Sequence, residues 1–161
     1  MSVIKIRPAV ASDCALILHF IRELAEYENA LPEVVADEAA LEATLFAENP
    51  VAFGLICTVD DKPAGLAIYF FNFSTWLGKC GLFLEDLYVS PEYRGSGAGK
   101  ALLKHLARLA VDKQCGRFEW NVLDWNEPAI KFYESFDAQA QNEWVGYRLT
   151  GDALARFAAA D

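Results

Sequence analysis

The stretch LEDLYVSPEYRGSGAGK, residues 84–100, decides the fold because it joins three local patterns within one short segment. An apolar strand that carries two adjacent carboxylates leads into a turn, then a glycine-rich loop, then an amphipathic helix. Glycine lets backbone N–H groups approach a ligand closely, and the N-terminus of a helix adds partial positive charge. The stretch therefore predicts an anion site, for which phosphate is the usual ligand.

Two familiar phosphate loops do not fit the spacing of this glycine-rich loop. A dinucleotide fingerprint needs a third glycine, and Lys100 stands in that place. A P-loop needs a glycine where Arg94 stands and a Ser or Thr where Ala101 stands. What remains is the pattern Arg94-x-x-Gly97-x-Gly99 after an acidic strand.

Length and composition indicate one globular domain over residues 1–161. Hydrophobic residues make up 54% of the chain, which is enough for a sizeable core. No apolar run reaches the ~18 residues that a membrane span needs. The N-terminus lacks the basic-then-apolar pattern of a signal peptide, because Lys5 and Arg7 lie in an alternating strand pattern. We therefore expect a cytoplasmic protein without a membrane partner.

Net charge and cysteine spacing limit the classes of ligand that we expect this protein to bind. The net charge of −9 argues against nucleic acid as a partner and suits a cationic substrate. Cys14, Cys57, Cys80 and Cys115 are far apart and form no Cys-x-x-Cys pair. We expect reduced, mostly buried thiols, and neither a metal site nor a disulfide framework.

The periodicity of apolar residues predicts a mixed α/β (α+β) sheet with helices on both faces. The element order is βααββ, βα, βα, β. The expected strands are 3–7, 51–59, 64–73, 82–90, 117–123 and a strand or hairpin over 144–149. The expected helices are 13–27, 37–49, one from the glycine-rich loop to about 112, a short one opened by Asn126 as cap, and 152–160.

A second motif follows the fifth expected strand, VLDWNEPAIKFYE at residues 122–134. Its Asn126, Ala129, Phe132 and Tyr133 match the pattern Asn-x-x-Ala-x-x-Phe-Tyr. Together with the Arg94 loop, it resembles the GNAT superfamily of N-acetyltransferases, which bind acetyl-CoA. The resemblance implies a mostly antiparallel sheet whose parallel central strands splay apart.

Almost the whole chain is similar to the spermidine/spermine N1-acetyltransferase family. The matching stretches are 6–9, 13–14, 23–28, 69–71, 84–86, 93–99 and 125–128, while 74–78, 91–93 and 122–126 look more like its thialysine N-epsilon-acetyltransferase branch. The polyamine branch has an aspartate where Ser74 stands, and an acid and a tryptophan where we align Val145 and Tyr147. These differences argue against a long polyamine. The family resemblance also implies a homodimer.

The alternation of the central strand suggests a catalytic base. It predicts that Phe83, Glu85, Leu87 and Val89 share one face, with Asp86 on the other. Burying an ionised carboxylate in so apolar a strand costs folding free energy unless the carboxylate is hydrogen-bonded or pairs with a cation. Glu85 is therefore the candidate base that takes the proton of the amine, and a structural role is the alternative, favoured for Asp86.

The resemblance assigns the remaining roles. Tyr133 is expected to protonate the coenzyme A thiolate. Substrate contacts are expected at Tyr27, Glu28, Trp76, Glu85, Glu119, Trp120 and Asn121. Cofactor contacts are expected at Leu87, Tyr88, Val89, Arg94, Gly95, Ser96, Gly97, Ala98, Gly99, Lys100, Asn126, Glu127, Pro128 and Ala129, with the backbone at 87–89 polarising the thioester carbonyl.

The resulting hypothesis is an acetyl-CoA-dependent N-acetyltransferase for a small cationic amine. Thialysine, lysine-like amino acids and short diamines come first, and polyamines follow. Two alternatives remain open at this point. One is acetylation of a protein N-terminus or lysine, which would require an open groove for the substrate chain. The other is a non-catalytic CoA-binding sensor on the same fold.

Overall fold

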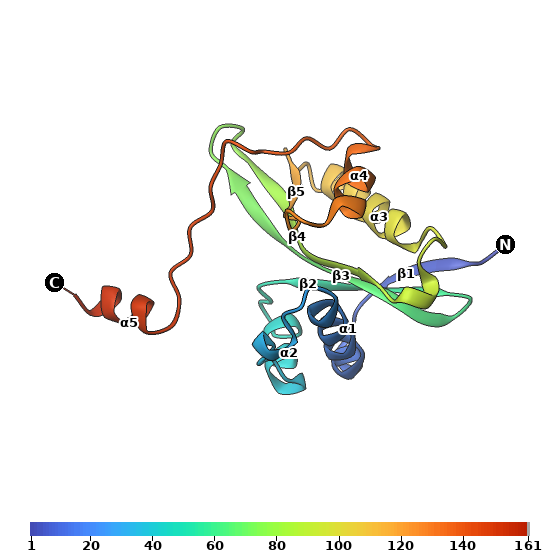
Figure 1. Cartoon of the computed structure of the whole chain (residues 1–161), viewed down its shortest axis with the longest axis horizontal. Coiled ribbons are helices and arrows are strands. Elements are labelled where there is room, and N and C mark those ends of the chain that lie inside the picture. Colours follow the sequence, from blue (N-terminus) through green and yellow to red (C-terminus); the bar gives the residue numbers. More distant parts are fainter. Residues whose placement is uncertain (161) are drawn as a thin grey trace. The chain divides into compact units, whose positions relative to one another are not determined.

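The computed structural model describes residues 1–160, which form two compact units, Met1–Asn121 and the segment from Val122 onward. The first unit holds a five-stranded sheet in the order β1-β2-β3-β4-β5 (Figure 1). Its strands are β1 (Ile4–Pro8), β2 (Phe53–Val59), β3 (Lys62–Ser74), β4 (Lys79–Val89) and β5 (Phe118–Trp120). Its helices are α1 (Cys14–Tyr27), α2 (Glu38–Leu45) and α3 (Ala98–Asp112), with 3-10 turns η1 (Ala11–Asp13), η2 (Leu31–Glu33) and η3 (Pro91–Tyr93).

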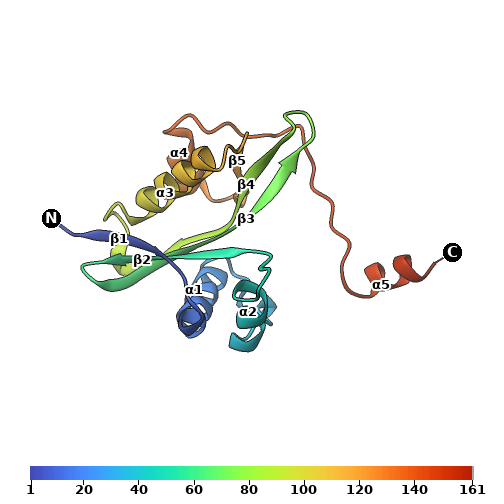
Figure 2. The same ribbon diagram turned by 180° about the vertical axis from the view of Figure 1, so that it is seen from behind.

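The sheet is mixed, as the sequence predicts. β1 to β4 pair antiparallel, and β5 joins β4 in parallel. Helices α1 and α2 cover one face and α3 covers the other, as the view from behind also shows (Figure 2). The parallel ladder runs only from Leu82–Phe118 to Leu84–Trp120, while β4 continues to Val89. Past Leu84, one edge of β4 therefore pairs with no strand among residues 1–160, which agrees with the expected splay.

Each face of the sheet has its own apolar core. On one face, Ile17 and Phe20 of α1 pack with Leu41 of α2 against Leu66 and Tyr88. On the other, α3 buries Leu102, Leu103 and Leu106 and packs against β4. The i, i+3, i+4 spacing that predicted α1 and α3 thus marks the sides that turn toward the sheet.

Strand β4 contains one residue more than its partner. Ile68 pairs with Asp86, and the next residue, Tyr69, pairs with Leu84. Glu85 therefore lies opposite no residue of β3. This arrangement is a β-bulge, which bends the strand and interrupts its alternation.

The bulge makes the predicted alternation of β4 wrong before Glu85 and leaves it correct after that residue. Residues that pair across an antiparallel ladder point to the same face of the sheet. By that rule Phe83 shares a face with Asp86 and Tyr88, and Leu84 shares the opposite face with Leu87. The prediction treated the strand as a strict period of two, so it exchanged the faces of Phe83 and Leu84, which precede the extra residue, whereas Leu87 and Val89 lie opposite Asp86 and Tyr88 as predicted.

The regular secondary structure of the second unit consists of helices. It contains α4 (Glu127–Glu134), whose N-cap position is Asn126 as predicted, and α5 (Gly151–Ala159). The strand or hairpin predicted over residues 144–149 is wrong, because residues 122–160 contain no strand. A strand needs a neighbouring edge to accept and donate its backbone hydrogen bonds. The alternation of apolar and polar residues over 144–149 is typical of a strand, but it does not provide a neighbouring strand to pair with.

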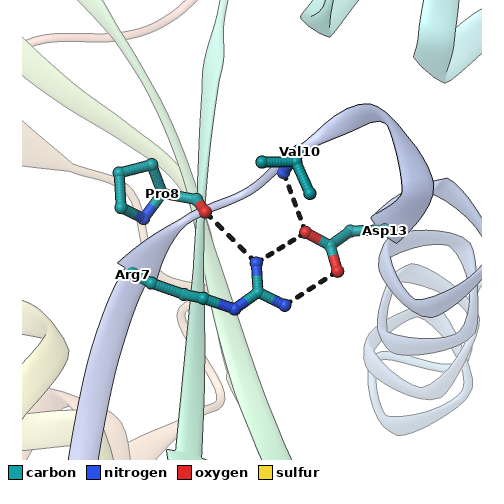
Figure 3. Close-up of polar contacts among 4 residues, drawn as sticks. All are labelled: Arg7, Pro8, Val10 and Asp13. Carbon is teal, nitrogen blue, oxygen red and sulfur yellow. Dashed lines mark hydrogen bonds and ion pairs between the residues drawn. The ribbon is translucent and has the colours of Figure 1, made fainter.

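One ion pair fixes the start of α1 to β1 (Figure 3). The Arg7 guanidinium donates to both Asp13 carboxylate oxygens, at 2.7 and 2.9 Å, and also to the Pro8 carbonyl. The Val10 backbone N–H donates to the same carboxylate at 2.8 Å. Hydrogen bonds from Arg7 hold the pKa of Asp13 below its ordinary value. Asp13 is buried, so this cluster replaces water around its charge.

We expect the Asp13→Ala substitution to lower the free energy of unfolding by about 1–3 kcal/mol, because it leaves the Val10 N–H and the Arg7 guanidinium without their acceptor. Lys5→Ala is the matched control, since Lys5 pairs with Asp61 on the surface. That exposed pair should contribute below about 0.5 kcal/mol. Urea unfolding at neutral pH measures both, and equal losses would contradict the role given to Asp13.

Candidate functional site

The glycine-rich loop presents unpaired backbone donors. Gly95 and Gly97 have φ of +79° and +93°, a region that favours glycine, and Gly97 forms the N-cap of α3. Among residues 1–160, no acceptor receives the N–H groups of Gly95, Gly97, Gly99 or Lys100. Space above the loop is open, because a Cβ built at Gly95 would meet nothing within 4 Å. These features fit a phosphate group, as the sequence predicts for this loop.

Arg94, at the start of this loop, contacts the protein through its guanidinium group. Its Nε donates to the Val89 carbonyl at 3.2 Å. Its guanidinium carbon lies 5.1 Å from the centre of the Tyr27 ring and 5.8 Å from that of Tyr88. Both distances are typical of cation–π contacts. Tyr27, which the sequence assigned to the substrate, therefore also contacts the residue that leads the cofactor loop.

A polar contact that the sequence did not predict fixes the end of β4. The Ser90 hydroxyl donates to Glu23 of α1 at 2.8 Å, and the other Glu23 oxygen lies 3.0 Å from His19 Nε2. Burial is the main cause that raises the pKa of Tyr88, and the neighbouring charge of Glu23 adds to it. No local motif marks Glu23, since its partner Ser90 is far away in the sequence.

An acidic pocket lies between α1, η2 and β4. Its volume is about 190 Å³. It is lined by Ile21, Leu24, Ala25, Glu28, Ala30, Glu33, Val34 and Asp86. Three carboxylates thus face a small, otherwise apolar space, and we call it the acidic pocket. Such a pocket favours a cationic ligand.

Asp86 is the perturbed group of the acidic pocket. Burial, followed by the nearby negative charges of Glu85 and Glu28, raises its pKa to about 6. Burial also raises the pKa of Glu28. Groups with such shifts are candidates for acid–base chemistry. The sequence assigned Asp86 a structural role and did not single out Glu33, because the bulge and the position of η2 are not local patterns.

The other predicted contacts in the first unit lie apart from this pocket. Glu85 is exposed at the bulge. Trp76 is 81% exposed in the β3–β4 turn. Ser74, at the end of β3, is six residues beyond Ile68, the partner of Asp86, which corresponds to roughly 20 Å along a strand. Within one chain, Trp76 therefore does not reach the acidic pocket.

The predicted residues 119–121 belong to β5 or directly follow it. Glu119 pairs with Phe83, and Trp120 pairs with Leu84. The Trp120 ring also packs edge-on against Phe118, with ring centres 4.9 Å apart. The first unit thus places these residues beside β4 where the parallel ladder ends.

Helix α4 carries the predicted residues of the second unit. Glu127, Pro128 and Ala129 form its first turn. Tyr133 packs against Phe132 and Phe136, with ring centres 5.8 and 6.3 Å away. Burial raises the pKa of Tyr133 above its ordinary value. The phenol therefore keeps its proton at neutral pH, as a proton donor must.

Within residues 1–160, no three or more His, Cys, Asp or Glu side chains come together as a metal site would require. None of the helices in that range combines the length and the apolar character needed to cross a bilayer.

Comparison with known proteins identifies the family. Residues 18–138 match the model of the acetyltransferase (GNAT) family. The thialysine N-epsilon-acetyltransferase of Sus scrofa is 40% identical, with 98% of this chain and 99% of the relative covered. That of Mus musculus is 38% identical with the same coverage. An L-ornithine N5-acetyltransferase of Arabidopsis thaliana is 31% identical over 93% of this chain and 86% of the relative.

Solved structures share the same fold. An integron cassette protein from the mobile metagenome of V. cholerae superposes with a TM-score of 0.82 at 28% identity, over 98% of both chains. An aminoglycoside acetyltransferase from a soil metagenome superposes with a TM-score of 0.76 at 18% identity, over 91% of this chain and 95% of that one. The fold predicted from the two motifs is confirmed.

Proposed function

The chain belongs to the acetyltransferase (GNAT) family and is an N-acetyltransferase, and we propose that its acceptor is the primary amine of a small cationic molecule. Thialysine, lysine-like amino acids and short diamines come first, and polyamines follow. The observation that carries the proposal is the acidic pocket, in which Asp86, Glu28 and Glu33 line one small space. The names of the relatives, which act on thialysine and ornithine, support the same class of substrate.

Acetyl-CoA would supply the acetyl group as an activated thioester. The unpaired N–H groups of the glycine-rich loop and the fixed Arg94 would hold its pyrophosphate. The open edge of β4 at residues 87–89 would donate backbone hydrogen bonds to the thioester carbonyl. By the family resemblance, Asn126 to Ala129 would contact the cofactor arm.

Asp86 would accept the proton of the amine. An alkylammonium has a pKa near ~10.4 and cannot attack until it loses a proton. With its pKa at about 6, Asp86 is ionised at neutral pH and can take that proton. We favour Asp86 over Glu85, since Asp86 lines the pocket and Glu85 is exposed.

Glu28 and Glu33 would pair with the distal ammonium of the substrate. Both line the acidic pocket, and Glu28 is half-buried, so its charge is poorly screened by water. The other predicted substrate contacts stay predictions: Tyr27, Trp76, Glu119, Trp120 and Asn121. Tyr133 is proposed as the acid that protonates the departing thiolate. A homodimer and a cytoplasmic location are also proposed, on the family resemblance and the composition.

Initial rates of coenzyme A release across a panel of amines test the proposed function. We expect thialysine, lysine and putrescine to react faster than spermidine or an N-terminal peptide, because the pocket is small and acidic. Butylamine, which lacks the distal charge of putrescine, is the matched control and should have a kcat/KM about tenfold or more below that of putrescine. A preference for the peptide would favour protein acetylation. Tight CoA binding without release from any amine would favour a sensor.

The pH dependence of kcat/KM separates the two candidate bases. Because a base works only when deprotonated, the rate should rise as pH increases through the Asp86 pKa of about 6. Asp86→Asn should remove that rise and lower kcat/KM by about 10²–10⁴-fold. Glu85→Gln, one residue away, should keep the rise. The reverse result, with the rise lost only in Glu85→Gln, would assign the base to Glu85.

Removing the Tyr133 hydroxyl tests the proposed acid. We expect Tyr133→Phe to lower kcat by about 10²-fold or more, because the thiolate then leaves without a proton donor. Affinity for CoA, measured by calorimetry, should change by less than about threefold, since the ring remains. Equal losses in turnover and in affinity would contradict the acid role.

A further inference from the structure

Two of the four cysteines lie in contact, although they are far apart in the sequence. The Sγ atoms of Cys80, in β4, and Cys115, which follows α3, are 3.2 Å apart, close enough for one thiol to donate a hydrogen bond to the other. Both side chains are half-buried, whereas Cys14 and Cys57 are buried, as the sequence predicts for most of the thiols. Cys80 and Cys115 therefore form a dithiol, which we call the thiol pair.

Backbone hydrogen bonds fix both members of the thiol pair. Cys115 occupies the second position after the C-cap of α3, and its N–H donates to the Ala110 carbonyl at 2.8 Å. The preceding Gln114 has φ of +58°, the left-handed conformation that is typical of a Schellman motif. On the other side, the Gly116 N–H donates to the Cys80 carbonyl at 2.8 Å. The turn between α3 and β5 thus holds Cys115 against the start of β4.

The surroundings of the thiol pair determine which thiol reacts first. Burial, followed by the hydrogen bond to Cys80 and the charge of that group, raises the pKa of Cys115 to about 11, while the charge of Lys113 acts in the opposite direction. Because the thiolate is the nucleophile, Cys115 is a poor first attacker at neutral pH, and Cys80 attacks first. A Cys80 sulfur that has formed a disulfide bond carries no negative charge, so that cause of the raised Cys115 pKa then disappears.

We propose that the thiol pair is a redox site, at which a small-molecule disulfide such as glutathione disulfide converts Cys80 and Cys115 to an intrachain disulfide. The Cys80 thiolate attacks one sulfur of glutathione disulfide, which breaks the S–S bond and releases one glutathione that takes up the proton lost by Cys80. Cys115 then loses its proton and attacks the Cys80 sulfur, and the second glutathione leaves with that proton. Two protein thiols are oxidised, and one glutathione disulfide is reduced to two glutathiones. The Sγ atoms need to approach by only roughly 1.2 Å to reach the length of an S–S bond.

The disulfide closes a covalent loop that contains most of the candidate site. Cys115 follows Cys80 by 35 residues, and the segment between them holds nearly all of β4, the glycine-rich loop and α3. The bond also ties the start of β4 to the segment that leads into β5, next to the first pair of the parallel ladder, Leu82 and Phe118. Closing such a loop lowers the entropy of the unfolded chain. The oxidised protein is therefore more stable to heat than the reduced protein.

Equilibration of the purified protein with glutathione and glutathione disulfide tests the proposal. The remaining thiols are alkylated after unfolding, and the peptides are identified by mass spectrometry. We expect one disulfide that joins Cys80 to Cys115, with Cys14 and Cys57 alkylated. The melting temperature should rise by about 4–16 °C on oxidation, the range expected for a disulfide in a chain of this size, and should return to the reduced value with dithiothreitol.

Single substitutions separate the thiol pair from nonspecific oxidation. Cys115→Ser leaves Cys80 without a second thiol, so this variant should stop at a mixed disulfide with glutathione and show no rise in melting temperature. Cys57→Ala is the matched control, because it removes a buried thiol outside the pair, and it should keep both the disulfide and the rise relative to its own reduced form. A wild-type protein that keeps all of its thiols free, or that stops at a mixed disulfide, would overturn the proposal. So would an equal rise in Cys115→Ser.

Discussion

The burial of one negative charge, on Asp86, is the constraint on which the candidate site depends. A carboxylate removed from water without a partner is unstable as an anion, so its pKa rises to about 6. Asp86 shares the face of Tyr88, which packs against α1, while the β-bulge leaves Glu85 outside the ladder. A bound ammonium would relieve the cost of that charge. The same burial thus explains both an affinity for cations and a capacity to accept a proton.

The C-terminal end of α1 joins the two halves of the site. Tyr27 contacts Arg94 at the start of the glycine-rich loop, and the next residue, Glu28, lines the acidic pocket. Two adjacent residues therefore serve the two ligands: Tyr27 contacts the arginine expected to hold the cofactor, and Glu28 is itself expected to pair with the amine. The Glu23–Ser90 hydrogen bond anchors α1 to the end of β4, one turn earlier. This link gives a structural reason for the position of α1 over the sheet.

The sequence predicted the local features well and the non-local ones poorly. The glycine-rich loop, α1, α3 and the cap position of Asn126 depend on residues within a turn or two of each other, and all are confirmed. The faces that Phe83 and Leu84 occupy relative to Asp86 depend on the register between β3 and β4, which no single strand reveals. The strand expected over residues 144–149 failed for a related reason, since alternation cannot supply a neighbouring edge. Glu33 was missed because the pocket that it lines is completed by Asp86, and Glu23 because Ser90, which donates to it, is distant in sequence.

The distribution of charge follows from the chemistry that the fold must serve. A negative chain attracts a cationic amine but repels coenzyme A, so the cofactor needs local compensation. Backbone N–H groups provide it at the loop without adding any charged side chain, and Arg94 contributes one fixed cation. The basic side chains Lys104 and Arg108 lie on the α3 face of the sheet, whereas Asp86 and Glu28 line a pocket formed with α1 on the other. The sheet therefore separates the two charge regions, which keeps the cations from neutralising the acidic pocket.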